Sequence, residues 1–64
     1  MLLYNVTFIH AYWHITTTVE VADNIMHDDV ISVAKDWIHG TSGLDLDKYR
    51  FVDIEVDYAG VAHV

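Results

Sequence analysis

One stretch near the C-terminal end of the chain decides the fold: Phe51-Val52-Asp53-Ile54-Glu55-Val56-Asp57-Tyr58. Apolar and acidic residues alternate in it with period two, and successive side chains of a β-strand point to opposite faces of the sheet. One face of this strand is therefore apolar and requires a core. The other face carries the carboxylates of Asp53, Glu55 and Asp57 at intervals of about 7 Å. The pattern predicts a fold and a kind of surface, but it does not by itself name an activity.

Two more strands are predicted in the first third of the chain. Residues 2–9 and 13–21 both alternate, and the β-branched run Thr16-Thr17-Thr18-Val19 favours strand over helix. A turn near His10-Ala11-Tyr12 joins them, although it lacks the Gly that a tight hairpin prefers. A short hairpin of this kind makes the two strands antiparallel neighbours.

A helix is predicted between the second and the third strand. Its apolar residues recur at helical spacing; they are Met26, Val30, Val33, Ala34, Trp37 and Ile38. We expect Asp23 or Asn24 to cap its start and Gly40 to end it, with residues 41–48 as a loop and residues 59–64 as a short tail. The Trp37-Ile38 end of the helix is expected to lie in the core.

The order of elements is therefore β-β-α-β, and a right-handed crossover through the helix places the first strand in the middle. This predicts a single α+β domain over residues 1–64, in which a three-stranded antiparallel sheet of order 2-1-3 carries one helix on one face. The helix is expected to cover Val6, Phe8, Ile15, Val19, Val52, Ile54 and Val56. The uncovered face would then present Asn5, Thr7, Ile9, His14, Thr16, Thr18, Glu20, Asp53, Glu55 and Asp57.

The charge balance restricts the class of partner. Ten acidic residues stand against Lys35, Lys48 and Arg50, which gives a formal charge of −7. Such a field repels nucleic acids and anionic membranes and attracts basic protein surfaces. We therefore expect neither nucleic acid nor membrane as a partner. The lack of Cys, of a secretory signal pattern and of an apolar run of about 20 residues predicts a cytoplasmic location.

None of the possible constellations for chemistry is complete. His10 and His14 flank the hairpin, but they lack the spacing of a known metal site even with Asp57 or His63 as a third ligand. Ser32, Asp36 and His39 would lie on one exposed helix face without a pocket. Asp45 and Asp47 lack the remaining ligands of a calcium loop. We expect no enzyme, no metal and no cofactor.

The residues that we expect to contact a partner lie on the acidic face and at the hairpin. We expect Trp13 in the core, and the alternative is an exposed aromatic patch of Tyr12 and Trp13 at the hairpin with Tyr49 nearby. Tyr12 is the better candidate for an interface anchor, since Tyr and Trp are frequent in binding hot spots. Lys48 and Arg50 are expected to pair with the acidic strand rather than with phosphates. The full predicted binding set is Glu20, Asp53, Glu55, Asp57, His14 and Tyr12.

The segments Thr18-Val19-Glu20-Val21-Ala22-Asp23, Ala34-Lys35-Asp36-Trp37 and Gly43-Leu44-Asp45-Leu46 resemble segments of short accessory proteins of tailed bacteriophages. The order of elements, the length and the acidity are similar to those of the early phage inhibitors of bacterial RNA polymerase. Those inhibitors use arginines on the third strand, where this chain has only Arg50 near the strand start. The resemblance implies a phage-encoded protein that acts in the bacterial host cytoplasm by binding a host protein.

Three hypotheses of function result. The first is a non-catalytic protein-binding module that uses its acidic sheet face to engage a basic surface of a host protein and to modulate or inhibit it. The second is a structural homo-oligomer, for example a homodimer, that pairs through the edge of the second or third strand. The third is a nucleic-acid mimic, in which carboxylates imitate phosphates and block a DNA- or RNA-binding protein.

Overall fold

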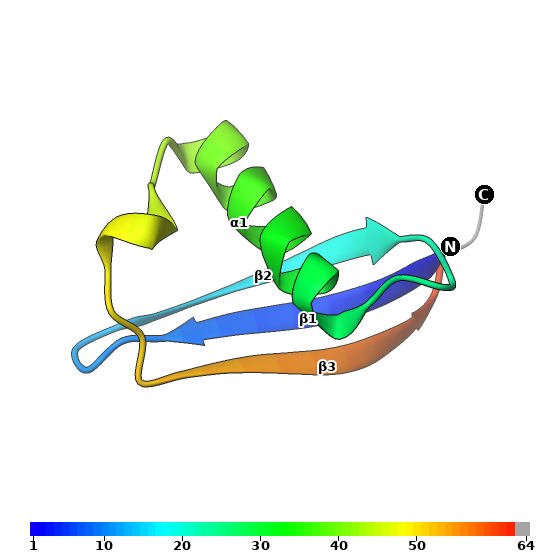
Figure 1. Ribbon diagram of the computed structural model, residues 1–64, viewed down its shortest axis with the longest axis horizontal. Helices are drawn as coiled ribbons and strands as arrows, with labels where there is room; N and C mark the ends of the chain where they lie inside the picture. The colour runs from blue at the N-terminus through cyan, green and yellow to red at the C-terminus, as the bar shows by residue number, and fades with distance from the viewer. Residues whose placement is uncertain (63–64) are drawn as a thin grey trace.

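The computed structural model describes residues 1–62 and contains three strands, one α-helix and one short 3₁₀ helix (Figure 1). In chain order they are β1 (Leu2–Ile9), β2 (His14–Val21), α1 (His27–Ser42), η1 (Leu46–Lys48) and β3 (Asp53–Val61). The strands form one antiparallel sheet of order β2-β1-β3. The predicted α+β fold with the first strand in the middle is confirmed.

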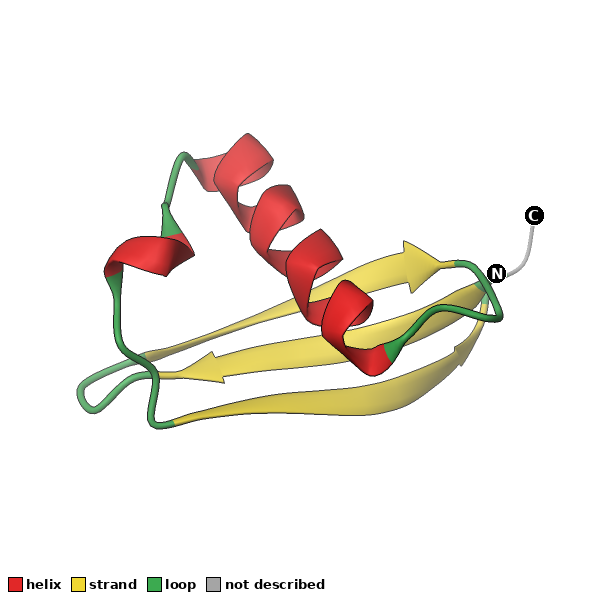
Figure 2. Cartoon of the chain, in the orientation of Figure 1, coloured by secondary structure: helices red, strands yellow, loops and turns green. Residues whose placement is uncertain are grey.

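The register places the apolar residues of all three strands on one side of the sheet. Phe8 of β1 lies opposite Ile15 of β2 and Ile54 of β3, and Val6 lies opposite Val56 one pair further along. The helix α1 crosses this side diagonally (Figure 2). The fully buried residues come from both layers and from η1; they are Val6, Phe8, Val19, Val21, Val30, Ala34, Ile38 and Leu46.

The start of the helix differs from the prediction. The helix begins at His27 after Met26, and no side chain caps it. Asp23 instead forms an ion pair with the N-terminal amine of Met1 at 3.2 Å, and the N–H of Ile25 donates to the carbonyl of Ala22. Residues 22–25 are thus used to turn the chain from the end of β2 onto the sheet, and the helix starts only after that turn.

The end of the helix lies beyond the predicted stop. Gly40 is part of the helix, and Gly43 is the C-cap, with a left-handed φ of 74°. The hydroxyls of Thr41 and Ser42 donate to the carbonyls of Trp37 and Ile38, so the last turn is hydrogen-bonded through side chains as well. After the cap, the expected loop contains η1, whose Leu46 is buried.

The third strand lies further along the chain than predicted. It begins at Asp53 and reaches Val61, so residues 59–61 of the expected tail belong to the sheet, and the N–H of Ala62 donates to the carbonyl of Met1. Residues 63 and 64 of that tail lie outside the described residues. Tyr58 pairs with Tyr4 and Gly60 with Leu3, which makes a β-bulge at Ala59.

Two residues predicted in the core are not there. Val52 precedes β3 and is 72% exposed, and Trp37 is 57% exposed. Val52 is exposed because it lies outside the strand, and Trp37 is exposed because α1 turns Val30, Ala34 and Ile38 to the sheet and leaves Trp37 on the flank of its apolar stripe. Trp37 and Val19 line the same groove, which shows that the Trp37 flank of α1 lies at the open edge of β2.

Candidate interaction surface

The uncovered face of the sheet carries the predicted row of acids. Asp53, Glu55 and Asp57 are exposed and lie along β3, which forms one edge of the sheet. Their neighbours across β1 are Ile9, Thr7 and Asn5, in that order. On the other side of β1, these three residues lie opposite His14, Thr16 and Thr18 of β2, in the same order. The outer face therefore has an acidic edge, a centre of hydroxyl and amide groups, and a second edge with few charges.

Two hydrogen bonds order the centre of this face. Thr18 Oγ1 donates to Asn5 Oδ1 at 2.6 Å, and the hydroxyls of Thr7 and Thr16 are 2.9 Å apart. The polar side chains of β1 and β2 thus satisfy one another across the strands. Of the β3 acids, Asp53 accepts the N–H of Ile54 at 2.9 Å. The surface next to the carboxylates is held by neutral groups that do not compensate their charge.

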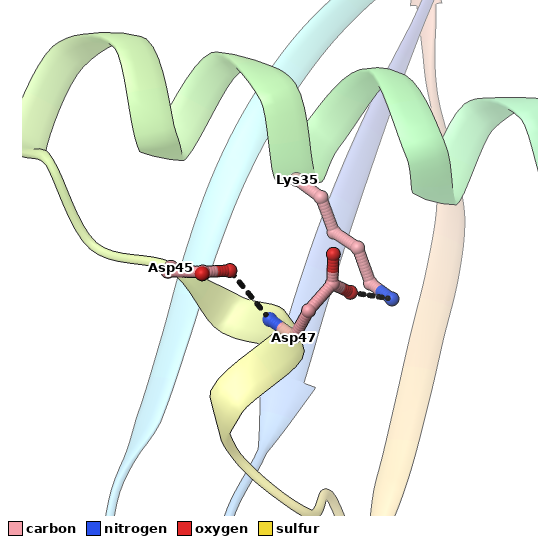
Figure 3. Close-up of polar contacts among 3 residues, drawn as sticks. All are labelled: Lys35, Asp45 and Asp47. Atoms are coloured by element: carbon pink, nitrogen blue, oxygen red, sulfur yellow. Dashed lines mark hydrogen bonds and ion pairs between the residues drawn. The ribbon is translucent and has the colours of Figure 1, made fainter.

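The ion pairs within residues 1–62 lie elsewhere. Lys35 Nζ of α1 is 3.1 Å from Asp47 Oδ1 of η1 (Figure 3), and the N-terminal amine pairs with Asp23. The expected pairing of Lys48 and Arg50 with the acidic strand is wrong for this part of the chain. Both basic residues precede β3: Lys48 ends η1, and Arg50 lies in the segment between η1 and β3. Within the described residues, no cationic side chain therefore pairs with the acidic row.

The other predicted contact residues lie around this row. His14 is in line with Asp53, separated from it by Ile9 of β1. Glu20 lies at the far end of β2 opposite Leu3, and two strand spacings, about 10 Å, separate its strand from β3. Tyr12 is at the hairpin turn and is 91% exposed. The structure thus brings Asp53, Glu55 and Asp57 together, and sets Glu20, His14 and Tyr12 at the periphery.

The hairpin end contains an aromatic cluster in which His10 and Phe51, which the sequence analysis did not include, join Trp13 and Tyr49. The ring of His10 stacks on that of Trp13, with centroids 4.8 Å apart and planes 8° apart. Tyr49 and Phe51 contact the Trp13 ring edge-on, at 5.3 and 5.8 Å. No local sequence pattern indicates that the ring of His10 stacks in this cluster. The cluster gives His10 a structural role.

A second feature missed by the sequence analysis is a groove at the open edge of β2. It has a volume of about 370 Å³ and is lined by Leu3, Thr18, Val19, Glu20, Val33 and Trp37. The groove exists because the exposed flank of α1 overhangs the edge strand. The sequence contains one indication of this groove: Val33 and Trp37 lie one helical turn apart on the same side of the apolar stripe.

The described residues contain no group of three or more His, Asp and Glu side chains that could hold a metal ion. In the same part of the chain, α1 lacks the length and the continuous apolar run of a membrane-spanning helix. Comparison with known proteins finds no similarity that assigns the chain: no family model, no curated protein and no solved structure matches it.

Proposed function

We propose that this protein is a non-catalytic binding module that engages a basic surface of another protein through the acidic row of β3. The observation that carries the proposal is the geometry of that row. Asp53, Glu55 and Asp57 are exposed on one face of one strand, spaced by two residues each. Within residues 1–62 none of them has a cationic side chain as a partner.

The electrostatics of such a row favour fast and salt-sensitive association. The three charges point in the same direction from a rigid sheet, so their fields add, and the chain as a whole carries a formal charge of −7. Complementary charges at an interface mainly raise the association rate and exclude wrong partners. At physiological ionic strength exposed charges are screened beyond about 8 Å. Binding is therefore expected to weaken strongly with added salt.

The resemblance to short phage proteins supports the choice of partner. A phage-encoded protein of this kind would act in the cytoplasm of the infected bacterium, on a host protein whose basic surface normally meets an acidic partner or a nucleic acid. Binding there would modulate or inhibit that host protein. No enzymatic step is required of the chain itself, and the proposed action is steric and electrostatic.

The experiment uses two triple variants that remove the same number of charges from opposite layers. The test variant is Asp53→Asn, Glu55→Gln and Asp57→Asn. The control variant is Asp28→Asn, Asp29→Asn and Asp36→Asn on the exposed side of α1. Proteins captured from a bacterial lysate by the wild type are identified by mass spectrometry, purified, and tested individually for their association rate with all three forms.

The proposal predicts that a captured partner associates with the wild type and with the helix variant at similar rates, but more than about tenfold more slowly with the β3 variant at low salt. It also predicts that added salt removes most of the difference. Equal association rates for the two triple variants would contradict the assignment of β3, because they would show that only the total charge matters.

A further inference from the structure

The two edges of the sheet differ in whether they can pair with a copy of themselves. An exposed edge strand carries free backbone groups that can extend the sheet into another chain, and charged residues are a common protection against this. The edge formed by β3 is protected, because a symmetric antiparallel pair of β3 strands would bring the carboxylates of Asp53, Glu55 and Asp57 against their own kind. It also contains the bulge at Ala59.

The edge formed by β2 has neither a row of like charges nor a bulge. The N–H of His10 donates to the carbonyl of Trp13, and these two residues lie in the same register as the β1–β2 ladder. Hydrogen-bonded and non-hydrogen-bonded pairs alternate in an antiparallel ladder. Counting from the bonded pair His10–Trp13, every second residue of β2 bonds to β1. The residues between them direct their backbone N–H and C=O groups away from β1 and toward the open edge. The set is His14, Thr16, Thr18 and Glu20.

We infer that this edge joins two copies of the chain into a dimer with a continuous six-stranded sheet, through an antiparallel β2–β2 pair whose twofold axis passes through Thr17. This register pairs each outward-directed residue with another member of the set. Thr16 meets Thr18 of the second copy, and His14 meets Glu20 at each end, where the imidazole can donate a hydrogen bond to the carboxylate. The hydrogen bond of His14 with Glu20, made twice by symmetry, and the absence of like charges opposite each other therefore favour a second copy of this chain.

The groove above the edge supports the same occupant. Trp37 and Val33 rim it on the helix side and Val19 forms part of its floor. In the inferred register, Val19 is opposite Ile15 of the second copy. The apolar side chain of that Ile15 then lies beside the exposed indole of Trp37. Trp37 is 57% exposed in the single chain and would lose water contact near the twofold axis. Burial of aromatic surface is the main source of affinity that this edge can offer.

The inference is independent of the proposed function, because the β3 acids take no part in the seam. In the dimer, both β3 strands become the outer edges of the joined sheet. Their acidic rows face the same side and are separated by five strand spacings, about 24 Å. A partner large enough to span both rows would meet two parallel lines of negative charge.

The first test is a cysteine crosslink, which the chain permits because it contains no Cys. Thr17→Cys places two thiols opposite each other in a non-hydrogen-bonded pair, whose Cα atoms are about 4.5 Å apart, within reach of a disulfide. Thr16→Cys is the register control: it is more exposed, but its own copy lies diagonally across the seam at about 7–8 Å. Mild oxidation is expected to crosslink the Thr17→Cys protein well before the Thr16→Cys protein. Equal crosslinking of the two, or none, overturns the register.

The second test measures the dimer directly by sedimentation equilibrium. His14→Glu brings two carboxylates together at each end of the seam and is expected to raise the dimer dissociation constant about tenfold, since the symmetry counts each like-charge pair twice. Adding Glu20→Lys to that variant places a cation opposite each new carboxylate and should restore most of the loss. His27→Glu, the same change at an exposed site outside the seam, is the control and should have no effect.

Three results would overturn the inference. One is a wild-type chain that stays monomeric up to millimolar concentration. This holds also if an extended basic peptide binds at the β2 edge, because the edge would then serve another partner. Another is a dimer whose dissociation constant is the same for the wild type and for His14→Glu. The third is a dimer that is lost with changes on β3 but not with changes on β2.

Discussion

Thr18 donates a hydrogen bond of 2.6 Å to the amide oxygen of Asn5, and Asn5 lies directly opposite Asp57 on the other neighbouring strand. The amide of Asn5 thus separates the hydroxyl-bearing strand β2 from the acidic strand β3. It is neutral at a position where a carboxylate would meet Asp57 at the distance of a cross-strand pair.

Asn5→Asp is expected to lower the free energy of unfolding by about 0.2–1 kcal/mol at low salt, because like charges directly opposite each other in a sheet are destabilising. The new carboxylate can still accept from Thr18, so the loss reports charge and not the lost hydrogen bond. Urea unfolding at low and high ionic strength measures it, and the effect should shrink with salt. Adding Asp57→Asn should restore the wild-type value; a double variant as unstable as the single one would contradict the explanation.

The two glycines near the end of α1 are expected to respond to alanine in opposite directions. Gly43 is the C-cap with a φ of 74°, where a Cβ is strained, so Gly43→Ala should cost about 1–2 kcal/mol. Gly40 is helical, and nothing lies within 4 Å of the place that an alanine Cβ would occupy, so Gly40→Ala should stabilise by about 0.5–1 kcal/mol. Thermal unfolding checks both, since a change of about 1 kcal/mol shifts the midpoint by about 4–8 °C in a domain of this size. Shifts of the same sign would show that Gly43 does not end the helix.

The aromatic cluster at the hairpin predicts unequal effects at two adjacent residues. Trp13→Ala removes the ring that stacks on His10 and contacts Tyr49 and Phe51, and should cost about 3 kcal/mol, the lower end of the range for buried aromatic residues. Tyr12→Ala should change the stability by less than about 0.5 kcal/mol, because Tyr12 is 91% exposed. Denaturant unfolding distinguishes the two. If Tyr12→Ala also proves strongly destabilising, Tyr12 is part of the fold and not a free contact residue.

The sheet was predictable from the sequence because several independent signals agree on it. The alternation in β3 assigns Ile54 and Val56 to the core side and Glu55 to the other side, and the observed register does the same. A shift of one residue would bury Glu55, so the pattern strongly determines the register. The strand order followed from one hairpin and one crossover. The acidic row was predictable for the same reason, since it is the reverse side of the apolar pattern.

The position and the ends of the helix were not predictable, because they depend on contacts between distant segments. Helical periodicity shows an apolar stripe, but not which flank of the stripe overhangs the sheet edge, so Trp37 was predicted in the core and is exposed. Gly40 and Gly43 are equally good stop signals locally. The structure continues the helix through Gly40 and ends it at Gly43, which has the left-handed φ. The groove at β2 and the role of His10 were missed for the same reason.

The connection between α1 and β3 predicts a graded series of effects, which follows from burial and not from charge. Leu46 of η1 is 2% exposed and packs in the core, so Leu46→Ala should cost about 2–4 kcal/mol, a large part of the total stability of a domain this small. Asp45 Oδ1 accepts the N–H of Asp47 at 3.1 Å and caps η1, and its replacement by Ala should cost about 1 kcal/mol (Figure 3).

The ion pair of Lys35 with Asp47 should contribute least of the three, although it is the most visible contact in this region. Both side chains are open to solvent, which screens their attraction, so Lys35→Met should change the stability by less than about 1 kcal/mol, and by less still at high salt. Urea unfolding of the three variants under one condition ranks them. A Lys35→Met variant that is less stable than Asp45→Ala would show that the ion pair, and not the cap on η1, holds this connection against the helix.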